Sequence, residues 1–382
     1  MNNPFKYGHE VSGYHFYDRE RDCAKLCRRL IDGGSNVVMY APRRYGKTSL
    51  VSKVLGKLSH EHGIKSLLFD LTMVTTLSGF CEQYVNAIYA MIGGRRELMH
   101  LLTNHLAALN PQLSVNVAGV VQIKLDIRNA LTENSIAEVL DLPERLAEDV
   151  GGKPFVVAFD EFQEVAELSA AFALEKIFRS RIQKHRHVRY VFLGSKTHLL
   201  ERMFMDHSRP FYRSAQEMPL GKPSIEDSRE FLRTRFADAG IMIGAAEIEA
   251  ILALSDNIPY YLQAIAYSVF DAVSDADRTE VSAEDIEAAV TDLTMSGAGY
   301  YGAVIAGLSE SQRLVVAALA RERTAVFDAA YRERFELPTS STLHSALKEL
   351  MNDGIVEQMD GVYYLGDPFF VRYLLASPGR VF

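Results

Sequence analysis

The chain has 382 residues, of which 48% are apolar and 24% charged, and its formal net charge is −8. These values are typical of a globular protein of two or three domains. The acidic balance argues against a dominant nonspecific grip on nucleic acid but leaves room for a local basic face. No stretch approaches the roughly 18 apolar residues of a membrane helix, and the N-terminus has no signal pattern. We therefore expect a cytoplasmic protein with no membrane contact.

The first predicted element is an amphipathic helix that follows Phe16-Tyr17-Asp18-Arg19-Glu20 and ends at Asp32-Gly33-Gly34. It carries Cys23 and Cys27, which with Cys81 are the three cysteines of the chain. No further Cys or His completes a zinc set, so we interpret these cysteines as small packed residues rather than a metal site or a disulfide framework.

Residues 37–50 have the pattern of a phosphate-binding loop between a short buried strand, residues 37–40, and a helix that opens at Gly46. Backbone N–H groups of such a loop surround phosphates, the lysine adds a positive charge and the threonine hydroxyl ligates Mg²⁺. Against G-x-x-x-x-G-K-[ST] the one departure is Ala41, which is tolerable if its φ stays negative. The alternative is a turn that only caps a helix. The loop residues are Ala41, Pro42, Arg43, Arg44, Tyr45, Gly46, Lys47, Thr48 and Ser49.

The next segment alternates helices and strands before a second informative stretch. We expect a strand at 64–71, a β-hairpin inserted near 113–127 with a central Gly119, and helices at 50–62, at 77 to about 109 and at 135–150. Residues 154–159 then form a continuous apolar run, typical of a strand buried in a parallel sheet, and end in Asp160 and Glu161.

Two adjacent carboxylates at the end of a buried strand are costly unless a cation uses them. In nucleotide hydrolases the first carboxylate, here Asp160, holds Mg²⁺ and the second, Glu161, polarises the attacking water. The alternative is that both project into solvent. Their coexistence with Lys47 favours the catalytic interpretation.

Another buried strand, residues 188–195, ends in Ser195. Its hydroxyl is suited either to a γ-phosphate or water contact or to a strand-to-helix cap. A loop at 208–213 carries Arg209 and Arg213, of which one could neutralise transition-state charge or simply be solvated.

From Ser224 onward the strand signals stop, and helices near 224–239, 245–255, 260–273 and 282–294 predict a small all-α domain. Pro259 suits the first turn of the third of these helices. Residues 297–302 read as a linker. Helices at 309–319, 324–335 and 342–353, followed by a hairpin at 354–365 with a turn at Asp360-Gly361, predict a winged helix.

The third helix of this predicted winged helix carries Lys348 and His344 but also Glu349 and Asp353. Contact with duplex DNA and docking to a protein partner therefore both remain open.

Several ordered motifs of the chain together resemble the archaeal-type ATPase family, P-loop ATPases of the AAA+ and STAND branch. They are Phe16-x-Asp18-Arg19-Glu20, Pro42-Arg43-Arg44-x-Gly46-Lys47-Thr48-Ser49-Leu50, Phe159-Asp160-Glu161-Phe162-Gln163, Gly194-Ser195, Pro259-Tyr260-Tyr261-Leu262-Gln263 and Asp367-Pro368-Phe369-Phe370.

The resemblance implies an α/β fold, with an αβα P-loop NTPase core built on a parallel sheet, a helical lid and a C-terminal winged helix. The corresponding boundaries are a tail at 1–15, the core at 16–220, the lid at 221–296 and the winged helix at 297–382.

The resemblance also assigns roles. The segment with Phe16 and Arg19 would lie beside adenine, as would Pro259, with Asn257 where the family pattern has glycine. Ser195 would be the sensor residue, and Arg213 would act in cis or, in a homo-oligomer, in trans.

The sequence thus predicts an Mg²⁺-dependent ATPase that couples its nucleotide state to a partner through the winged helix. Two alternatives stay open: a switch that binds ATP or ADP and barely hydrolyses it, and an ATP-regulated DNA-binding protein.

Overall fold

The computed structural model describes residues 2–8, 13, 16–93, 96–109, 111–115, 121–125, 132–166, 168, 171–359 and 361–376. The chain divides into two compact units. We call Arg19–Ala41 with Lys47–Leu220 the core unit. Met1–Asp18, Pro42–Gly46 and Gly221–Phe382 form the other, which we call the helical unit.

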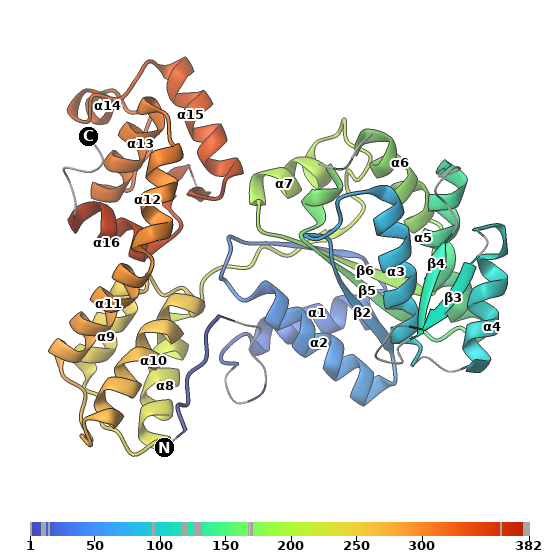
Figure 1. Ribbon diagram of the computed structural model, residues 1–382, viewed down its shortest axis with the longest axis horizontal. Coiled ribbons are helices and arrows are strands. Elements are labelled where there is room, and N and C mark those ends of the chain that lie inside the picture. The colour runs from blue at the N-terminus through green and yellow to red at the C-terminus, as the bar shows by residue number, and fades with distance from the viewer. Residues whose placement is uncertain are drawn as a thin grey trace. The chain divides into compact units, whose positions relative to one another are not determined.

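A five-stranded, all-parallel sheet with the order β2-β5-β6-β1-β7 is the centre of the core unit (Figure 1). Every residue of β5 is buried, as the continuous apolar sequence of this strand predicts. The four longer strands confirm the predicted ones; β7, of two residues, was not predicted because so short a strand has no periodicity. The strands are β1 (Val37–Tyr40), β2 (Lys65–Asp70), β5 (Phe155–Asp160), β6 (Val188–Gly194) and β7 (Gln216–Glu217).

Helices cover both faces of this sheet. Alternate β5 residues, Phe155, Val157 and Phe159, share one apolar cluster with α3, α5 and α6, while α1 and α2 pack together on the opposite face (Figure 1). The sequence did not predict α6 or α7. The helices of the core unit are α1 (Glu20–Ile31), α2 (Lys47–His62), α3 (Leu77–Met91), α4 (Arg96–His105), α5 (Glu133–Asp149), α6 (Ala171–Ile182) and α7 (Thr197–Met205), with short 3-10 turns η2 (Ala107–Leu109) and η3 (Phe162–Ala166).

Aromatic packing fixes the end of β5. The Phe159 ring stacks on Tyr190 and Phe192 of β6 at centroid distances of 6.1 and 6.3 Å. Phe162, three residues on, packs against Phe192 at 4.6 Å and is fully buried. Residues 160 and 161 are therefore held between two anchored rings, which restricts where their side chains can go.

The predicted hairpin is confirmed as the antiparallel pair β3 (Pro111–Val115) and β4 (Val121–Leu125). Asn86 of α3 ties β4 to the core unit because its amide both donates to the carbonyl and accepts from the N–H of Ile123, each at 2.8 Å. Gly119, the predicted centre of the hairpin, lies outside the described residues.

Four helices follow the core in the helical unit, as predicted, and Pro259 is at the first turn of the third. The N-terminal residue Phe5 is fully buried against Phe231 and Phe236 of α8, with centroids 5.8 and 4.8 Å away. These helices are α8 (Ile225–Asp238), α9 (Ala245–Leu254), α10 (Pro259–Asp275) and α11 (Ala283–Ser296).

The winged helix is present, but three details of the prediction were wrong. The expected linker at 297–302 is the start of helix α12, because Tyr301 is buried against Phe370 and Tyr373. The expected helix at 324–335 shrinks to α14, since Thr324 pairs with Tyr363 of the wing in an isolated antiparallel bridge. A helix after the wing, α16, was missed. Asp360 of the predicted wing turn lies outside the described residues. The elements are α12 (Ala298–Gly307), α13 (Glu310–Arg321), α14 (Ala329–Arg334), α15 (Ser340–Asn352), β8 (Val356–Met359), β9 (Val362–Leu365) and α16 (Pro368–Ala376).

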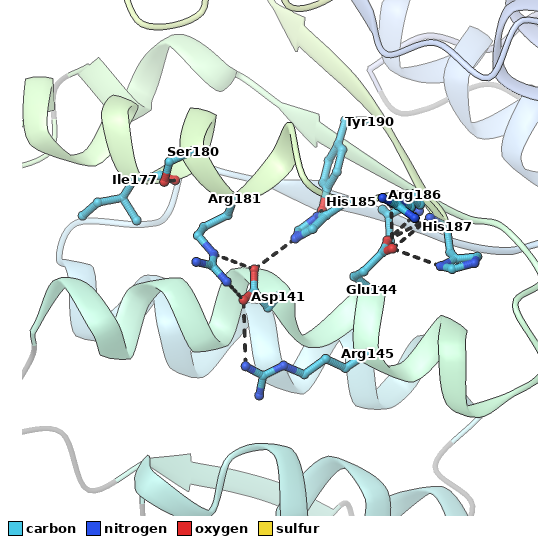
Figure 2. Close-up of polar contacts among 11 residues, drawn as sticks. Asp141, Glu144, Arg145, Ile177, Ser180, Arg181, His185, Arg186, His187 and Tyr190 are labelled. Carbon is cyan, nitrogen blue, oxygen red and sulfur yellow. Dashed lines mark hydrogen bonds and ion pairs between the residues drawn. The ribbon is translucent and has the colours of Figure 1, made fainter.

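Two carboxylates of α5 lock the start of β6 (Figure 2). Glu144 accepts hydrogen bonds from the backbone N–H groups of residues 186, 187 and 188 at 2.7 to 3.0 Å. Asp141 accepts from Arg181 at 2.8 Å and lies 3.0 Å from Nε2 of His185, whose Nδ1 lies 2.7 Å from the buried Tyr190 hydroxyl. Although burial acts in the opposite direction, the hydrogen bonds from His185 and Arg181 lower the pKa of Asp141 to about 2.

We expect Asp141→Asn to destabilise the core unit by about 1–3 kcal/mol at pH 7, because it removes a charged partner from buried groups. A pKa lowered on folding contributes stability above the unfolded value of about 3.9, and this is lost as the pH falls toward about 2. The difference from wild type in urea unfolding should therefore shrink between pH 4 and 2. Asp32→Asn, at an exposed aspartate, is the control; a difference that does not vary with pH would contradict the prediction.

Candidate functional site

The loop between β1 and α2 has the predicted strand–loop–helix form, since β1 ends at Tyr40 and α2 begins at Lys47. Its left-handed residues are Arg44, with a φ of 72°, and Gly46, with a φ of 83°, so Ala41 is not where the chain needs a glycine. The Lys47 side chain is only 5% exposed, and its ammonium donates to the Ala41 carbonyl at 2.7 Å. The Lys47 side chain therefore connects the first turn of α2 to Ala41, the first residue of the loop.

The first turn of α2 and the end of β5 meet through one short hydrogen bond. The Thr48 hydroxyl donates to Oδ2 of Asp160 at 2.6 Å. Asp160 is 7% exposed, and burial raises its pKa in spite of that bond. A hydroxyl and a carboxylate oxygen are hard donors of the kind that Mg²⁺ prefers, so these two residues fit a magnesium site.

Glu161, the second carboxylate, is already engaged by other side chains. One of its oxygens, Oε2, accepts from the Ser195 hydroxyl at 2.7 Å, from the Ser195 N–H at 3.2 Å and from the amide of Gln163. Its backbone is left-handed, with a φ of 49°, which is uncommon for a residue other than glycine and is often found at functional sites. Glu161 and Ser195 are thus brought into direct contact with each other.

Gln163 is a site residue that the sequence reasoning quoted in a motif without giving it a role. It is 1% exposed, and the glycine at 194 makes room for it. A Cβ at Gly194 would lie 2.1 Å from Oε1 of Gln163 and 2.5 Å from Cδ1 of Leu200, both far too close. A glycine at the end of a buried strand, beside the Asp-Glu strand, was the available signal.

Arg19 and Arg213, which the resemblance placed at the site, have other contacts in the core unit. Arg19 is 6% exposed, takes a left-handed φ of 69° before α1, and pairs with Asp22 at 3.4 Å. Arg213 is exposed, with its guanidinium carbon 5.2 Å from the centre of the Tyr212 ring. Its backbone N–H donates to the Phe204 carbonyl at 3.0 Å.

Ser49 is buried in the first turn of α2 in the core unit, and the remaining predicted residues belong to the helical unit. They include the loop tip Pro42–Gly46, whose Arg44 and buried Tyr45 contact this unit. Phe16 donates its N–H to the Gly13 carbonyl at 3.2 Å, and Pro259 begins α10. Asn257 adopts a φ of 51°, the left-handed conformation that the glycine of the family pattern would take, and donates to the Pro223 carbonyl.

The three cysteines are free, and burial raises the pKa of Cys23 to about 11 and of Cys81 to about 12. Both are therefore protonated at neutral pH. In the described part of the chain, Glu144, Glu148 and His187 could each offer a metal ligand within 4.8 Å of one another. Because Glu144 already accepts three backbone N–H groups, we assign that cluster to the fold rather than to a metal.

The parallel sheet, the loop after β1, the acidic pair after β5 and the C-terminal winged helix give the chain an α/β fold of the P-loop NTPase kind followed by a winged helix. This confirms the predicted fold class. The family described as a probable winged helix domain matches residues 299–376.

Solved structures match nearly the whole chain at low identity. A Walker-type ATPase of Pyrococcus abyssi has a TM-score of 0.67 and 18% identity, over 94% of this chain and 96% of its own. The Aeropyrum pernix ORC2 protein, solved with ADPNP and ADP, has a TM-score of 0.58 and 14% identity over 95% and 93%. The ORC1 protein of the same organism, solved with DNA, has a TM-score of 0.50 and 16% identity over 98% and 94%.

None of the curated proteins matches the chain in sequence. Within the described ranges, every helix is too short or too polar to span a bilayer.

Proposed function

We propose that the protein is an Mg²⁺-dependent ATPase whose nucleotide state is coupled to a partner. The observation that carries this proposal is the arrangement of Lys47, Thr48, Asp160, Glu161 and Ser195 at one edge of the sheet. The likeness to ATPase structures supports the fold and is consistent with this function, but the residues carry the argument.

Each residue has a role that its chemistry suits. Lys47 and the backbone N–H groups of Arg43–Ser49 bind the β- and γ-phosphates. Thr48 and Asp160 hold Mg²⁺, which neutralises charge that develops on the phosphate oxygens. Glu161 orients or deprotonates the attacking water, and Ser195 contacts either the γ-phosphate or that water.

Adenine binding is assigned to the segment of Phe16 and Arg19 and to Pro259. Stabilisation of the charge of the transition state is assigned to Arg213, which acts in cis or, from a second copy, in trans. These assignments rest on the resemblance alone.

A second function, a slowly hydrolysing nucleotide switch, is favoured by one observation. Oε2 of Glu161 accepts three hydrogen bonds, so this oxygen is already occupied by donors of the protein. Oε2 must exchange these partners for water before it can act as a base. Turnover would then be slow until a partner shifts Gln163 or Ser195.

The partner of the winged helix, we propose, is a protein rather than duplex DNA. Its arginines 323, 334 and 372 are in ion pairs with Asp256, Glu322 and Glu287. Apolar side chains are instead exposed around the wing: Phe327 by 40%, Met359 by 52% and Val362 by 39%. Among the described residues, these three arginines are already neutralised by carboxylates, which disfavours contact with phosphates.

Lys47→Ala should abolish ATP binding, because it removes the cation that the phosphates need. Lys57→Ala, on the exposed face of the same helix, is the control and should leave ATP binding intact. Calorimetric titration measures both affinities, and wild-type affinity in Lys47→Ala would contradict the assignment of the phosphate loop.

Glu161→Gln should bind ATP with normal affinity but hydrolyse it 100-fold or more slowly, which corresponds to about 3 kcal/mol of barrier. Calorimetric titration measures the binding and phosphate release measures the hydrolysis.

Gln163→Met should raise the ATPase rate several-fold, since it keeps the volume of the buried side chain but removes one donor to Glu161. Steady-state turnover beside wild type is the measurement, with thermal unfolding as the check on folding. A lower rate in a folded variant would mean that Gln163 orients Glu161 productively and would count against the switch.

Duplex DNA should show no salt-dependent binding to the full chain in fluorescence anisotropy at about 50 mM salt. Tight binding that weakens as salt rises, and that Lys348→Glu reduces, would replace the protein partner by DNA.

A further inference from the structure

The tip of the phosphate loop is held within the helical unit by its arginine. The guanidinium carbon of Arg44 lies 4.6 Å from the centre of the Tyr260 ring and 4.8 Å from that of Tyr261. Its Nη1 lies 2.9 Å from Oδ2 of Asp367 and also donates to the Tyr261 hydroxyl. Arg44 makes these contacts from a left-handed backbone, with a φ of 72°.

Asp367 is oriented for this contact by its own helix. Its Oδ1 caps α16 by accepting from the N–H groups of Phe369 at 2.9 Å and Phe370 at 3.2 Å. This leaves Oδ2 for Arg44, and the Tyr301 hydroxyl also donates to Oδ2 at 3.3 Å. One carboxylate thus joins the first turn of the last helix to the phosphate loop.

The two tyrosines that complete the contact are packed into the same unit. The Tyr261 ring meets Phe369 edge-on at 5.1 Å, and the Tyr301 ring stacks on Phe370 at 5.2 Å. Burial raises the pKa of both hydroxyls, so each remains a neutral donor. A shift of Asp367 would therefore be felt by α10, α12 and α16 together.

Carboxylate and phosphate are interchangeable partners for a guanidinium, because its planar fork of N–H groups suits both. Arg44 stands in the loop that we propose to bind phosphates, yet its cationic group is occupied by a carboxylate. A nucleotide adds several negative charges to that loop, and these repel Asp367 while attracting Arg44.

We propose that Asp367 competes with nucleotide phosphates for Arg44, so that nucleotide binding frees the start of α16 from the phosphate loop. The inference rests on the proposed nucleotide binding and adds the route by which the winged helix senses it. Since such coupling is reciprocal, a partner that pulls on α16 must also change nucleotide affinity by the same factor.

The test is Asp367→Asn in the full chain, with ADP affinity measured by calorimetry. Asparagine is as good a helix cap as aspartate, so the substitution keeps the cap of α16 and removes only the charge. We expect ADP to bind five-fold or more tightly than to wild type. Asp292→Asn, an exposed aspartate of α11, makes the same change of net charge as a control and should leave affinity unchanged.

A second readout follows α16 itself. Addition of ADP to wild type should speed the deuterium exchange of residues 368–376, and it should have little effect on them in Asp367→Asn. In an Arg44→Gln background, Asp367→Asn should no longer change affinity, because the residue through which it acts is gone.

The outcomes separate the two levels of the argument. If wild type binds ADP and Asp367→Asn matches the Asp292→Asn control or binds more weakly, the competition is wrong while nucleotide binding stands. If neither wild type nor Asp367→Asn binds ADP or ATP, the proposed function itself fails.

Discussion

The hydrogen bond between Thr48 and Asp160 is the interaction on which the site depends. It joins the first turn of α2 to the end of β5, although β6 lies between β1 and β5 in the sheet. Two strand pairings make it possible: Tyr40 is level with Gly194, and Phe159 is level with Phe192. Because all these strands are parallel, their carboxyl ends meet at one edge, where loops can bring polar groups together.

Burial sets the chemistry of that edge. Asp160, Ser195 and Gln163 are each less than a tenth exposed, so their polar groups need partners within the protein. Glu161 supplies one such partner through Oε2, and its left-handed backbone is held between the packed rings of Phe159 and Phe162. The same contacts that satisfy the buried groups also occupy the carboxylate proposed to activate water.

The loop tip has a different environment. Arg44 and Tyr45 belong with the helical unit, while Lys47 and Thr48 belong with the core unit, so one short loop is shared between two bodies. Proteins that couple ligand binding to a distant movement need an element whose contacts differ between the free and the ligand-bound state. The pair of Arg44 and Asp367 is the element that we propose for this role, because a guanidinium can pair with phosphate as well as with carboxylate.

The sequence by itself determined every described strand except β7, the loop after β1, the acidic pair and most helices, because period, apolar runs and turn residues are local signals. It misread residues 297–302, where glycines suggested a linker, because the packing of Tyr301 on Phe370 decides for a helix. It gave no role to Gln163, Gly194 or Asp367. Their importance lies in contacts between residues 31 and 323 positions apart in the chain, for which no local pattern exists. Only the tertiary structure decided which donors hold Glu161 and which acid holds Arg44.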